Sequence, residues 1–431
     1  MDAALETSAT PAQAGWVDRA GKVLPAGGFG NYDPSIVIAR GKGARVWDED
    51  GNDYVDLLIG SGPMLVGHGH PEVLEAVEAQ IRDGMTYFAN NARGIELAEE
   101  ICAAVTCADQ TRFVSTGGEA DMYAMRLARA HTGRTRIMKF EGGYHGMSGE
   151  ALMSLTPTRL ENFPNAVPDS AGIPDSVREQ MLIAPFNDID FARSLIAEHG
   201  DDIAAVIVEP LQRIVPPEPG FLQALREETE KRGIVLIFDE VVTGFRFAYG
   251  GAQELYGVTP DVCTLGKVIG GGFPLAAIAG KTEFMDHFDK ARVGEEGFLF
   301  QIGTLSGNPV ASAAGLKTME ILKRPGAYDA LRATGRRIMT AIEKSLGDAG
   351  VPHAVVGDPT LFEVVFTEEE KVLDYRATQR GDKALARRYN QLLREKGIFK
   401  SDGKTYVSLA MTETDLEQVE SAIDFAARNL G

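Results

Sequence analysis

The feature that most constrains the fold is a series of short apolar segments that alternate with helical patterns between residues 71 and 310. Six of these segments lack regular polar alternation, as expected for strands that are buried on both faces of a sheet. They are residues 111–115, 136–140, 203–208, 234–238, 262–265 and 275–279. Helices are predicted between them, for example over 119–131 and 221–232. This alternation predicts an α/β fold with a largely parallel sheet.

The two ends of the chain have a different pattern. Short half-apolar runs on either side of Asp50-Gly51 predict a hairpin, since glycine accepts the positive φ of such a turn. Near the end of the chain, a helix is predicted over 384–396, and Thr414-x-x-Glu417 has the pattern of a helix capping box. We therefore expect a smaller α+β domain beside the large one. The predicted boundaries are residues 1–70 and 316–431 for the smaller domain and 71–315 for the large domain.

The composition is that of a globular protein and argues against several partners. Of 431 residues, 44% are hydrophobic and 24% are charged, and the formal net charge is −19. A negative net charge repels the phosphates of nucleic acids and of anionic lipids, so neither nucleic acid nor membrane is expected as a partner. Three cysteines without CxxC spacing argue against disulfides and a cysteine zinc site. Residues 1–6 lack the features of a signal peptide, and the expected location is cytoplasmic.

One connection, residues 149–179, is unusually long for a compact domain and contains Pro157, Pro164, Pro168 and Pro174. A segment of this kind is typical either of a lid over a site or of a surface excursion. The sequence leaves both interpretations open.

Two strand ends carry groups that suit a ligand. At Thr116-Gly117-Gly118 a predicted strand ends and a helix begins, where free backbone N–H groups and the helix dipole can bind a phosphate. Such a turn is also common as simple helix punctuation. Asp239 and Glu240 end a hydrophobic strand, and α/β sheets bind ligands at this edge. An acid there can equally cap a helix or bind a metal.

Two further residues lie beside glycines. Lys267 follows an apolar strand and precedes three glycines; a lysine is usually a solvated surface charge, but partial burial would make its amine a nucleophile and a base. Tyr144 lies in Gly142-Gly143-Tyr144-His145-Gly146, where its ring could stack on a flat cofactor or pack in the core. His145 is expected to be a hydrogen-bonded structural residue rather than a base.

A phosphate-binding turn, an acid, an amine and an aromatic plate together meet the requirements of pyridoxal phosphate. The chain resembles the class III aminotransferases, which belong to fold type I of the enzymes that use this cofactor, and within them the glutamate-1-semialdehyde aminomutase branch. The resemblance runs over nearly the whole chain. It rests on Asp239–Arg246, Thr264–Pro274, Gly303–Pro309, Val206–Pro210 and the proline-rich stretch around Asp169.

The resemblance implies a fold and a set of site residues. The implied large domain has a mostly parallel seven-stranded sheet between helices. Lys267 is expected to bind the cofactor aldehyde covalently, and Asp239 to be the partner of the pyridinium nitrogen; these are the two expected catalytic residues. The expected cofactor-binding residues are Thr116, Gly117 and Gly118 at the phosphate, Tyr144 and Val241 on the two faces of the ring, Glu209, Asp239 and Lys267, and Thr304 from the neighbouring subunit of a homodimer. No metal is expected.

Two departures from the family pattern concern the phosphate and the substrate. The phosphate turn of the family usually reads Ser-Gly-Thr, and Thr116-Gly117-Gly118 keeps the backbone donors but lacks one hydroxyl. The aminomutases carry an arginine in an N-terminal substrate segment, and the equivalent residues 27–32 have none. Because an arginine fork binds a carboxylate best, this loss argues against glutamate-1-semialdehyde as the substrate. Phe29 and Tyr32 are instead expected to line an apolar or aromatic pocket.

The predicted function is that of an aminotransferase dependent on pyridoxal phosphate. It would move an amino group between an amine or amino acid and a keto or aldehyde acceptor by a ping-pong mechanism, with Lys267 moving the proton. The alternative within the family is an intramolecular 2,1-aminomutase of the glutamate-1-semialdehyde type, with the segment 149–179 as a lid. An alternative of another class is a nucleotide-binding or non-catalytic α/β protein. Against it, the chain contains neither G-x-G-x-x-G nor G-x-x-x-x-G-K, and His68-Gly69-His70 lacks a third metal ligand nearby.

Overall fold

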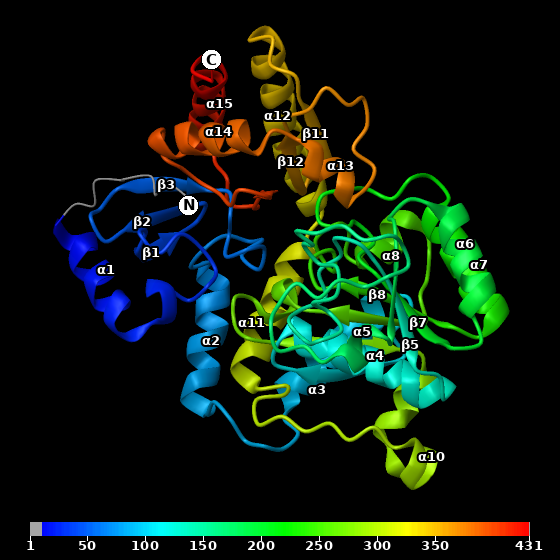
Figure 1. Cartoon of the computed structure of the whole chain (residues 1–431). Helices are drawn as coiled ribbons and strands as arrows, with labels where there is room; N and C mark the ends of the chain where they lie inside the picture. Colours follow the sequence, from blue (N-terminus) through cyan, green and yellow to red (C-terminus); the bar gives the residue numbers. More distant parts are fainter. Residues whose placement is uncertain (1–10, 431) are drawn as a thin grey trace.

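A computed structural model describes residues 11–430 and has a seven-stranded sheet at its centre (Figure 1). The strands are β4 (Gln110–Val114), β5 (Arg136–Phe140), β6 (Met181–Ala184), β7 (Ile203–Val208), β8 (Val235–Glu240), β9 (Val262–Leu265) and β10 (Ala276–Gly280). Their order is β4-β10-β9-β8-β7-β5-β6. β10 pairs antiparallel with both of its neighbours, and the other adjacent pairs are parallel. The predicted mostly parallel sheet is therefore confirmed.

The strands contribute alternate side chains to two hydrophobic cores, one on each face of the sheet. In β8, Leu236 and Phe238 belong to the larger core, whereas Val235 and Ile237 belong to the other. Every residue of β8 is buried. Burial on both faces explains why the strand segments show no polar alternation in the sequence.

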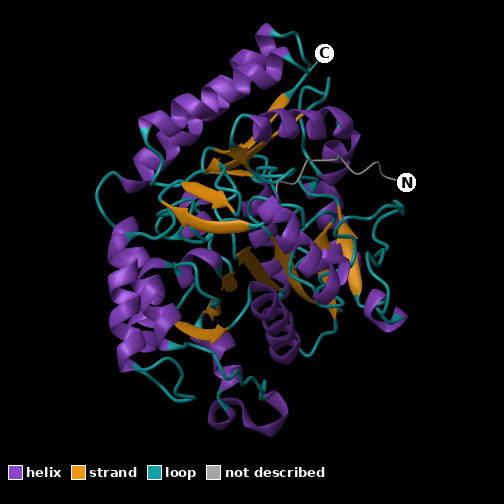
Figure 2. Cartoon of the chain, turned by 90° about the vertical axis from the view of Figure 1, so that its left-hand side faces the viewer, coloured by secondary structure: helices purple, strands orange, loops and turns teal. Residues whose placement is uncertain are grey.

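Helices enclose this sheet, and Figure 2 shows them around the outside of the strands. The smaller core is covered by α4, which contributes Ala120, Ala124 and Ala128, whereas α3 contributes Leu97 and Ile101 to the larger core. The elements of this region are α2 (Pro71–Asp83), α3 (Ala92–Ala104), α4 (Gly117–Thr132), α5 (Asp175–Arg178), α6 (Ile189–His199), α7 (Phe221–Arg232), α8 (Gly251–Tyr256), η2 (Lys267–Gly270), α9 (Thr282–Met285), η3 (Asp286–Phe288), α10 (Lys290–Gly297) and α11 (Pro309–Leu322).

Segments from the beginning and the end of the described chain meet in a smaller sheet. β13 pairs parallel with β3, with Ile398 opposite Val55, and Figure 1 shows the blue strands of the N-terminal part next to α14 and α15 of the C-terminal part. The predicted hairpin is confirmed, since β2 and β3 are antiparallel and Gly51 between them has a φ of +86°. The domain boundaries stay a prediction. The elements are α1 (Pro11–Val23), η1 (Pro25–Gly27), β1 (Ile38–Lys42), β2 (Arg45–Asp48), β3 (Asp53–Asp56), α12 (Ala327–Asp348), β11 (Ala354–Asp358), β12 (Leu361–Val365), α13 (Tyr375–Arg380), α14 (Lys383–Glu395), β13 (Ile398–Phe399), β14 (Thr405–Tyr406) and α15 (Glu413–Arg428).

The capping box of α15 lies two residues before the predicted position. The N–H of Asp415 donates to Oγ1 of Thr412 at 3.3 Å, and the N–H of Thr412 donates to Oδ2 of Asp415 at 2.9 Å. The prediction of Thr414 and Glu417 is therefore wrong. Thr412-x-x-Asp415 fits the same short pattern, and Arg45 fixes the choice because its Nε donates to Oδ1 of Asp415 at 2.7 Å.

The long connection over residues 149–179 is anchored to the core. Nζ of Lys139 donates to the carbonyl oxygens of Ala151 and Met153, at 2.8 Å in each case. The two halves of the segment are also joined, since the N–H of Ser154 donates to the carbonyl of Val167 at 2.7 Å. Met153 is fully buried. The segment is thus a packed part of the molecule, and its function as a lid stays a prediction.

The three cysteines are free thiols, with Cys107 and Cys263 buried and Cys102 half-buried. Residues 1–6, on which the signal-peptide prediction depends, lie outside the described residues. Between residues 11 and 430, no helix has both the length and the apolar character needed to cross a bilayer.

Candidate active site

The candidate site lies at the carboxyl ends of the parallel strands. Asp239 of β8 is paired in register with Thr264 of β9, and Lys267 follows the end of β9. Glu209 follows β7, and Thr116 lies between β4 and α4. Because the carboxyl ends of parallel strands share one edge, the sheet itself gathers these residues.

Asp239 is held by two hydrogen bonds. Its Oδ2 lies 2.8 Å from Nδ1 of His145, and its Oδ1 accepts a hydrogen bond from the N–H of Val241 at 3.1 Å. The Asp239 and His145 side chains are only 4% and 1% exposed. His145 is thus a hydrogen-bonded residue, as predicted, and its partner is the acid expected to be catalytic.

A further buried acid, Asp121 of α4, lies beside this pair and was not selected from the sequence. Oγ1 of Thr264 donates to Oδ1 of Asp121 at 2.6 Å. Burial, and the neighbouring carboxylate of Asp239, raise the pKa of Asp121 well above its ordinary value. A signal was available, since an acid at position 121 lies on the helical stripe of Ala124 and Ala128, which is otherwise apolar.

The same side chains are the candidates for holding a cation. Asp121, His145 and Asp239 each offer a ligand atom, and these atoms lie within 4.8 Å of one another, which makes them the one such group in residues 11–430. The hydrogen bonds from Thr264 and Val241 already engage both carboxylates. Besides offering ligand atoms to a cation, the group can therefore orient Asp239 and share protons with it.

Lys267 occupies a strained and largely enclosed position. Its φ is +48°, in the left-handed region that residues other than glycine rarely adopt. Burial lowers the pKa of its amine, because the charged form is poorly solvated there. A methyl group on Gly62 would lie 3.3 Å from each of three atoms, Cδ of Lys267, Nη2 of Arg246 and Cε1 of Tyr406. These three side chains therefore converge at Gly62.

The turn at Thr116–Gly118 forms the beginning of α4. Oγ1 of Thr116 accepts a hydrogen bond from the N–H of Glu119 at 3.2 Å, as a helix cap does. The N–H groups of Gly117 and Gly118 belong to the first turn, where an α-helix offers no acceptor. A methyl group on Gly117 would lie 2.8 Å from Cγ1 of Val241, and one on Gly118 would lie 3.0 Å from Cα of Gly146. The turn thus has close packing that only glycine allows, and its free donors fit a phosphate.

Tyr144 and Glu209 connect two strand ends. The N–H of Tyr144 donates to Oε2 of Glu209 at 2.8 Å, and this contact joins the loop after β5 to the end of β7. The Tyr144 ring is half-buried, and burial raises the pKa of its hydroxyl. Val241 lies close to both Gly117 and Gly266, since a methyl group on Gly266 would lie 3.1 Å from its Cγ1. Donors for a phosphate, a buried carboxylate and an enclosed amine together fit pyridoxal phosphate.

Thr304 and the aromatic residues of the N-terminal segment lie elsewhere in the single chain. Thr304 is exposed between α10 and α11 and lines a cavity of about 440 Å³ with Phe88 and Arg112. Phe29 is 84% exposed. The Tyr32 ring packs against the Phe399 ring in a tilted arrangement with centroids 4.8 Å apart, and its hydroxyl donates to the carbonyl of Lys400 at 2.9 Å. In the described chain Tyr32 thus packs against the smaller sheet, and the expected apolar pocket of Phe29 and Tyr32 stays a prediction.

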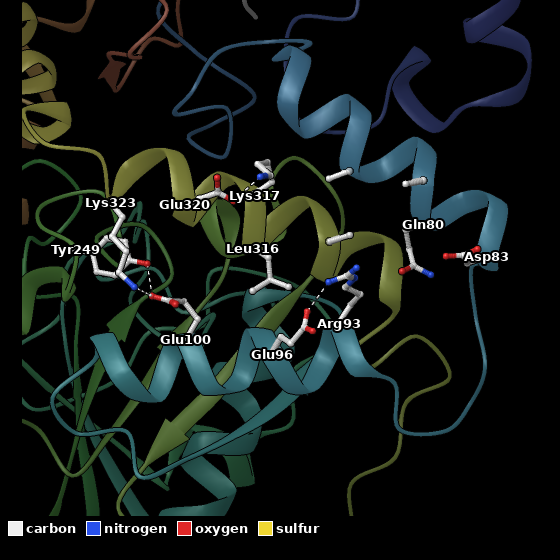
Figure 3. A pocket seen from close by; sticks show the side chains of 13 residues that line it. Gln80, Asp83, Arg93, Glu96, Glu100, Tyr249, Leu316, Lys317, Glu320 and Lys323 are labelled. Carbon is white, nitrogen blue, oxygen red and sulfur yellow. Dashed lines mark hydrogen bonds and ion pairs between the residues drawn. The ribbon is translucent and has the colours of Figure 1, made fainter.

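Another cavity, of about 510 Å³, lies between α2, α3 and α11 (Figure 3). Nζ of Lys323 donates to Oε1 of Glu100 at 2.7 Å, and Nη1 of Arg93 donates to Oε2 of Glu96 at 2.7 Å. Two of its acids are thus neutralised by its own bases, and it contains none of the predicted site residues. It is not the place for the predicted chemistry.

Comparison with known proteins decides the family. The sequence model of the family described as "Aminotransferase class-III" matches residues 29–424. The chain belongs to the class III aminotransferases. The cofactor of this family is pyridoxal phosphate, which the residues described above fit. This class III aminotransferase is 41% identical over 393 residues to the glutamate-1-semialdehyde 2,1-aminomutase 2 of Brevibacillus brevis, with 90% of each chain covered.

Two further similarities extend over nearly the whole chain. This class III aminotransferase is 40% identical over 422 residues to the glutamate-1-semialdehyde 2,1-aminomutase of Methanopyrus kandleri, with 96% of each chain covered. The crystal structure of an omega-transaminase from Sphaerobacter thermophilus superposes with a TM-score of 0.91 at 37% identity, with 97% of this chain and 98% of that chain covered. The fold is therefore fold type I, as the resemblance implied.

Proposed function

We propose that this class III aminotransferase is a transaminase that moves an amino group between an amine or amino acid and a keto or aldehyde acceptor in two half-reactions. The observation that carries the proposal is the enclosed amine of Lys267 at the same sheet edge as the buried Asp239–His145 pair. Aminotransfer requires a group that binds the cofactor covalently and also moves a proton. A buried lysine with a lowered pKa suits both tasks.

The proposed holders of the cofactor are the residues of this edge. Thr116, Gly117 and Gly118 would bind the phosphate through the free donors of α4, and Tyr144 and Val241 would hold the ring. When bound, pyridoxal phosphate supplies an electron-accepting ring that stabilises negative charge on the substrate carbon. Asp239, oriented by His145, would hold a proton on the ring nitrogen.

Lys267 is proposed to carry out the acid–base chemistry. Its Nζ would hold the cofactor aldehyde covalently. When not so engaged, Nζ would be the base that accepts a proton from the substrate carbon. Because burial lowers its pKa, more of the amine is unprotonated at neutral pH, as a base requires.

Borohydride reduction of the cofactor-loaded protein, followed by peptide mapping, tests the lysine assignment. We expect the reduced adduct on Lys267, and we expect Lys267→Ala to bind the cofactor without forming an adduct. An adduct on another residue, or none in the wild-type protein, contradicts the proposal. A panel of amine donors then tests aminotransfer, since each productive donor converts the absorbance of the bound cofactor from the aldehyde to the amine form.

The second candidate is an intramolecular aminomutase, which the similarity to two glutamate-1-semialdehyde aminomutases favours. The absence of arginine from residues 27–32 argues against that substrate. Glutamate-1-semialdehyde supplied alone distinguishes the two. Turnover without a separate acceptor supports the aminomutase, whereas turnover that requires both a donor and an acceptor supports the transaminase.

A homodimer with a shared site is part of the proposal. Phe88, Ile95 and Ile302 line the cavity that contains Thr304 and are 65%, 50% and 58% exposed. An apolar surface of this kind is unusual for a monomer. We propose that a second copy covers it and that Thr304 reaches the phosphate of the partner's site. A cytoplasmic location likewise stays a prediction.

A further inference from the structure

Arg213 lies at the tip of a tight turn in an unusual backbone conformation. The N–H of Gln212 donates to the carbonyl of Val215 at 2.9 Å, and the N–H of Val215 donates to the carbonyl of Gln212 at 2.8 Å. Arg213 between them has a φ of +61°. A side-chain hydrogen bond also holds the turn in place, since Nε2 of the buried Gln212 donates to the carbonyl of Glu141 at 2.7 Å. Backbone strain persists where surrounding contacts hold it, and it concentrates at functional sites.

The side chain of Arg213 lies next to the candidate active site. Its Cζ is 5.3 Å from the centroid of the Tyr144 ring. The same side chain lines a cavity of about 360 Å³ together with Gly142, Tyr375 and Gly403. Within residues 11–430, no carboxylate oxygen lies within 4.0 Å of its guanidinium. A half-buried arginine without an acidic partner thus stands between the Tyr144 ring and an open cavity.

Lys404 is a second cation on this side. It follows Gly403, which lines the same cavity, and precedes β14. A turn fixes its backbone, because its N–H donates to Oγ of Ser401 at 3.0 Å. Burial lowers the pKa of Lys404 to about 7, and the positive charge of Arg213 acts in the same direction.

The acids near these two cations have other partners. Of the three that line the cavity with Arg213, Glu363 pairs with Lys400, Asp382 caps α14, and Asp402 accepts a hydrogen bond from Nδ2 of Asn390. The carboxylates that attract the charge of Lys404 are those of Glu209 and Asp239. Glu209 accepts a hydrogen bond from the N–H of Tyr144, and Asp239 is bonded to His145. Within residues 11–430, neither Arg213 nor Lys404 forms an ion pair with a carboxylate, so an entering anion can pair with both directly.

We propose that Arg213, assisted by Lys404, binds a carboxylate of the substrate. The preferred substrates are then amino acids and keto or aldehyde acids rather than simple amines, an inference that rests on the proposed transaminase function. The planar fork of Arg213 can bind both carboxylate oxygens, and Lys404 adds a point charge. Arg213 and Lys404 would thereby supply the carboxylate-binding charge that residues 27–32 lack.

The test compares donors that differ only by a carboxylate in place of a methyl group. Three pairs cover three positions of the amine: alanine with isopropylamine, 3-aminobutanoate with 2-aminobutane, and 4-aminobutanoate with butylamine. Each donor is mixed with cofactor-loaded wild type, Arg213→Gln, Arg213→Lys and Arg336→Gln, and the half-reaction is followed by absorbance. Arg336 is exposed on α12, so its variant controls for the loss of one positive charge.

In the wild type we expect the carboxylate member of at least one pair to react faster. Arg213→Gln should lower kcat/KM for that member by about 10- to 100-fold, as loss of a hydrogen bond to a charged group does, and should leave the simple amine unchanged. The kcat/KM of Arg213→Lys for that member should lie between those of the wild type and Arg213→Gln, because lysine keeps the charge and loses the planar fork. Calorimetric titration with butanoate provides a readout without turnover, and its dissociation constant should rise in Arg213→Gln but not in Arg336→Gln.

The outcomes separate this inference from the proposed function. Equal losses for both members of a pair would mean that Arg213 supports folding or holds Tyr144, and would overturn the carboxylate assignment. A wild type that prefers simple amines would overturn it as well, while leaving the transaminase intact. A wild type that converts no donor contradicts the transaminase itself, and butanoate binding that is unchanged in Arg213→Gln then overturns the carboxylate site independently.

Discussion

Nδ1 of His145 lies 2.8 Å from Oδ2 of Asp239, so the glycine-rich loop after β5 is tied to the end of β8 inside the protein. The contact is shielded from water, where a hydrogen bond to a charged group is stronger than at the surface. His145 therefore fixes the direction of the acid on which the proposed chemistry depends.

Replacing His145 should weaken catalysis more than cofactor attachment. We expect His145→Ala to lower kcat by about 10- to 100-fold, because Asp239 loses its charge-assisted partner. Borohydride should still trap the cofactor on Lys267. Steady-state kinetics at saturating cofactor measure the first effect. His145→Asn, which keeps a donor, should recover part of the loss, and an unchanged kcat in His145→Ala would remove His145 from the mechanism.

Gly62 should tolerate no side chain. Gly62→Ala forces a φ of +115° on an alanine and places a methyl group 3.3 Å from Cδ of Lys267. We expect a loss of about 1–3 kcal/mol in the free energy of unfolding and slower covalent binding of the cofactor. Gly51→Ala is the control, since its φ is +86° and nothing lies within 4 Å of the added methyl group. Denaturation and absorbance kinetics of both variants separate backbone strain from crowding, and equal cofactor kinetics would contradict the crowding.

Lys139 should make stability depend on pH. Burial lowers its pKa from the ordinary 10.5 to about 7, so the unfolded chain binds more protons between these values. The wild type should therefore gain stability relative to Lys139→Met as the pH rises from 7 to 10, by up to about 1.4 kcal/mol per pH unit.

Urea denaturation at several pH values measures this difference. Lys344→Met, a change of an exposed lysine on α12, serves as the control and should show no such trend. If the wild type instead lost stability relative to Lys139→Met as the pH rises, the burial of a neutral amine at Lys139 would be contradicted.

Mixing of inactive variants tests the shared site. If Thr304 serves the partner's phosphate, Thr304→Asp should be nearly inactive, because its charge repels the phosphate. Mixed dimers of Thr304→Asp and Lys267→Ala contain one site with both native residues, so activity should return when subunits exchange. Lys267→Ala mixed with Asp239→Asn is the control and should stay inactive, since the structure brings those two residues together within one chain. Absence of recovery in the first mixture, with exchange shown by size, contradicts the shared site.

The sequence was informative where local pattern determines structure. The strands β5, β7 and β9 span the predicted residues because apolar runs buried on both faces have clear limits. β6 was not predicted, although it is as long as β9, because it closely follows the proline-rich segment, whose loop pattern obscures its beginning. The reversed direction of β10 depends on its pairing with β4 and β9, which no local pattern determines.

The same distinction holds for the site. Thr116–Gly118, Asp239 and Lys267 lie at turns after strands, and a turn motif is local. Arg213 and Lys404 are far apart in the chain, and Arg213 shares a cavity with Gly403, the residue before Lys404, only through the packing of β14 and the turn after β7. The proposed role of these two residues depends on their being close in space. No sequence motif records that proximity, so they could not be selected from the sequence.

The reversed strand β10 also limits how the enzyme can move. It pairs with β4 through Ala276 and Val114 and with β9 through Ala277 and Leu265, next to the turn that precedes α4 and to Lys267. Hydrogen bonds of three strands therefore set the spacing between the phosphate turn and the lysine. Any opening for substrate entry must leave this frame intact, so movement has to come from segments outside these three strands, and insertions that engineer access should avoid their ends.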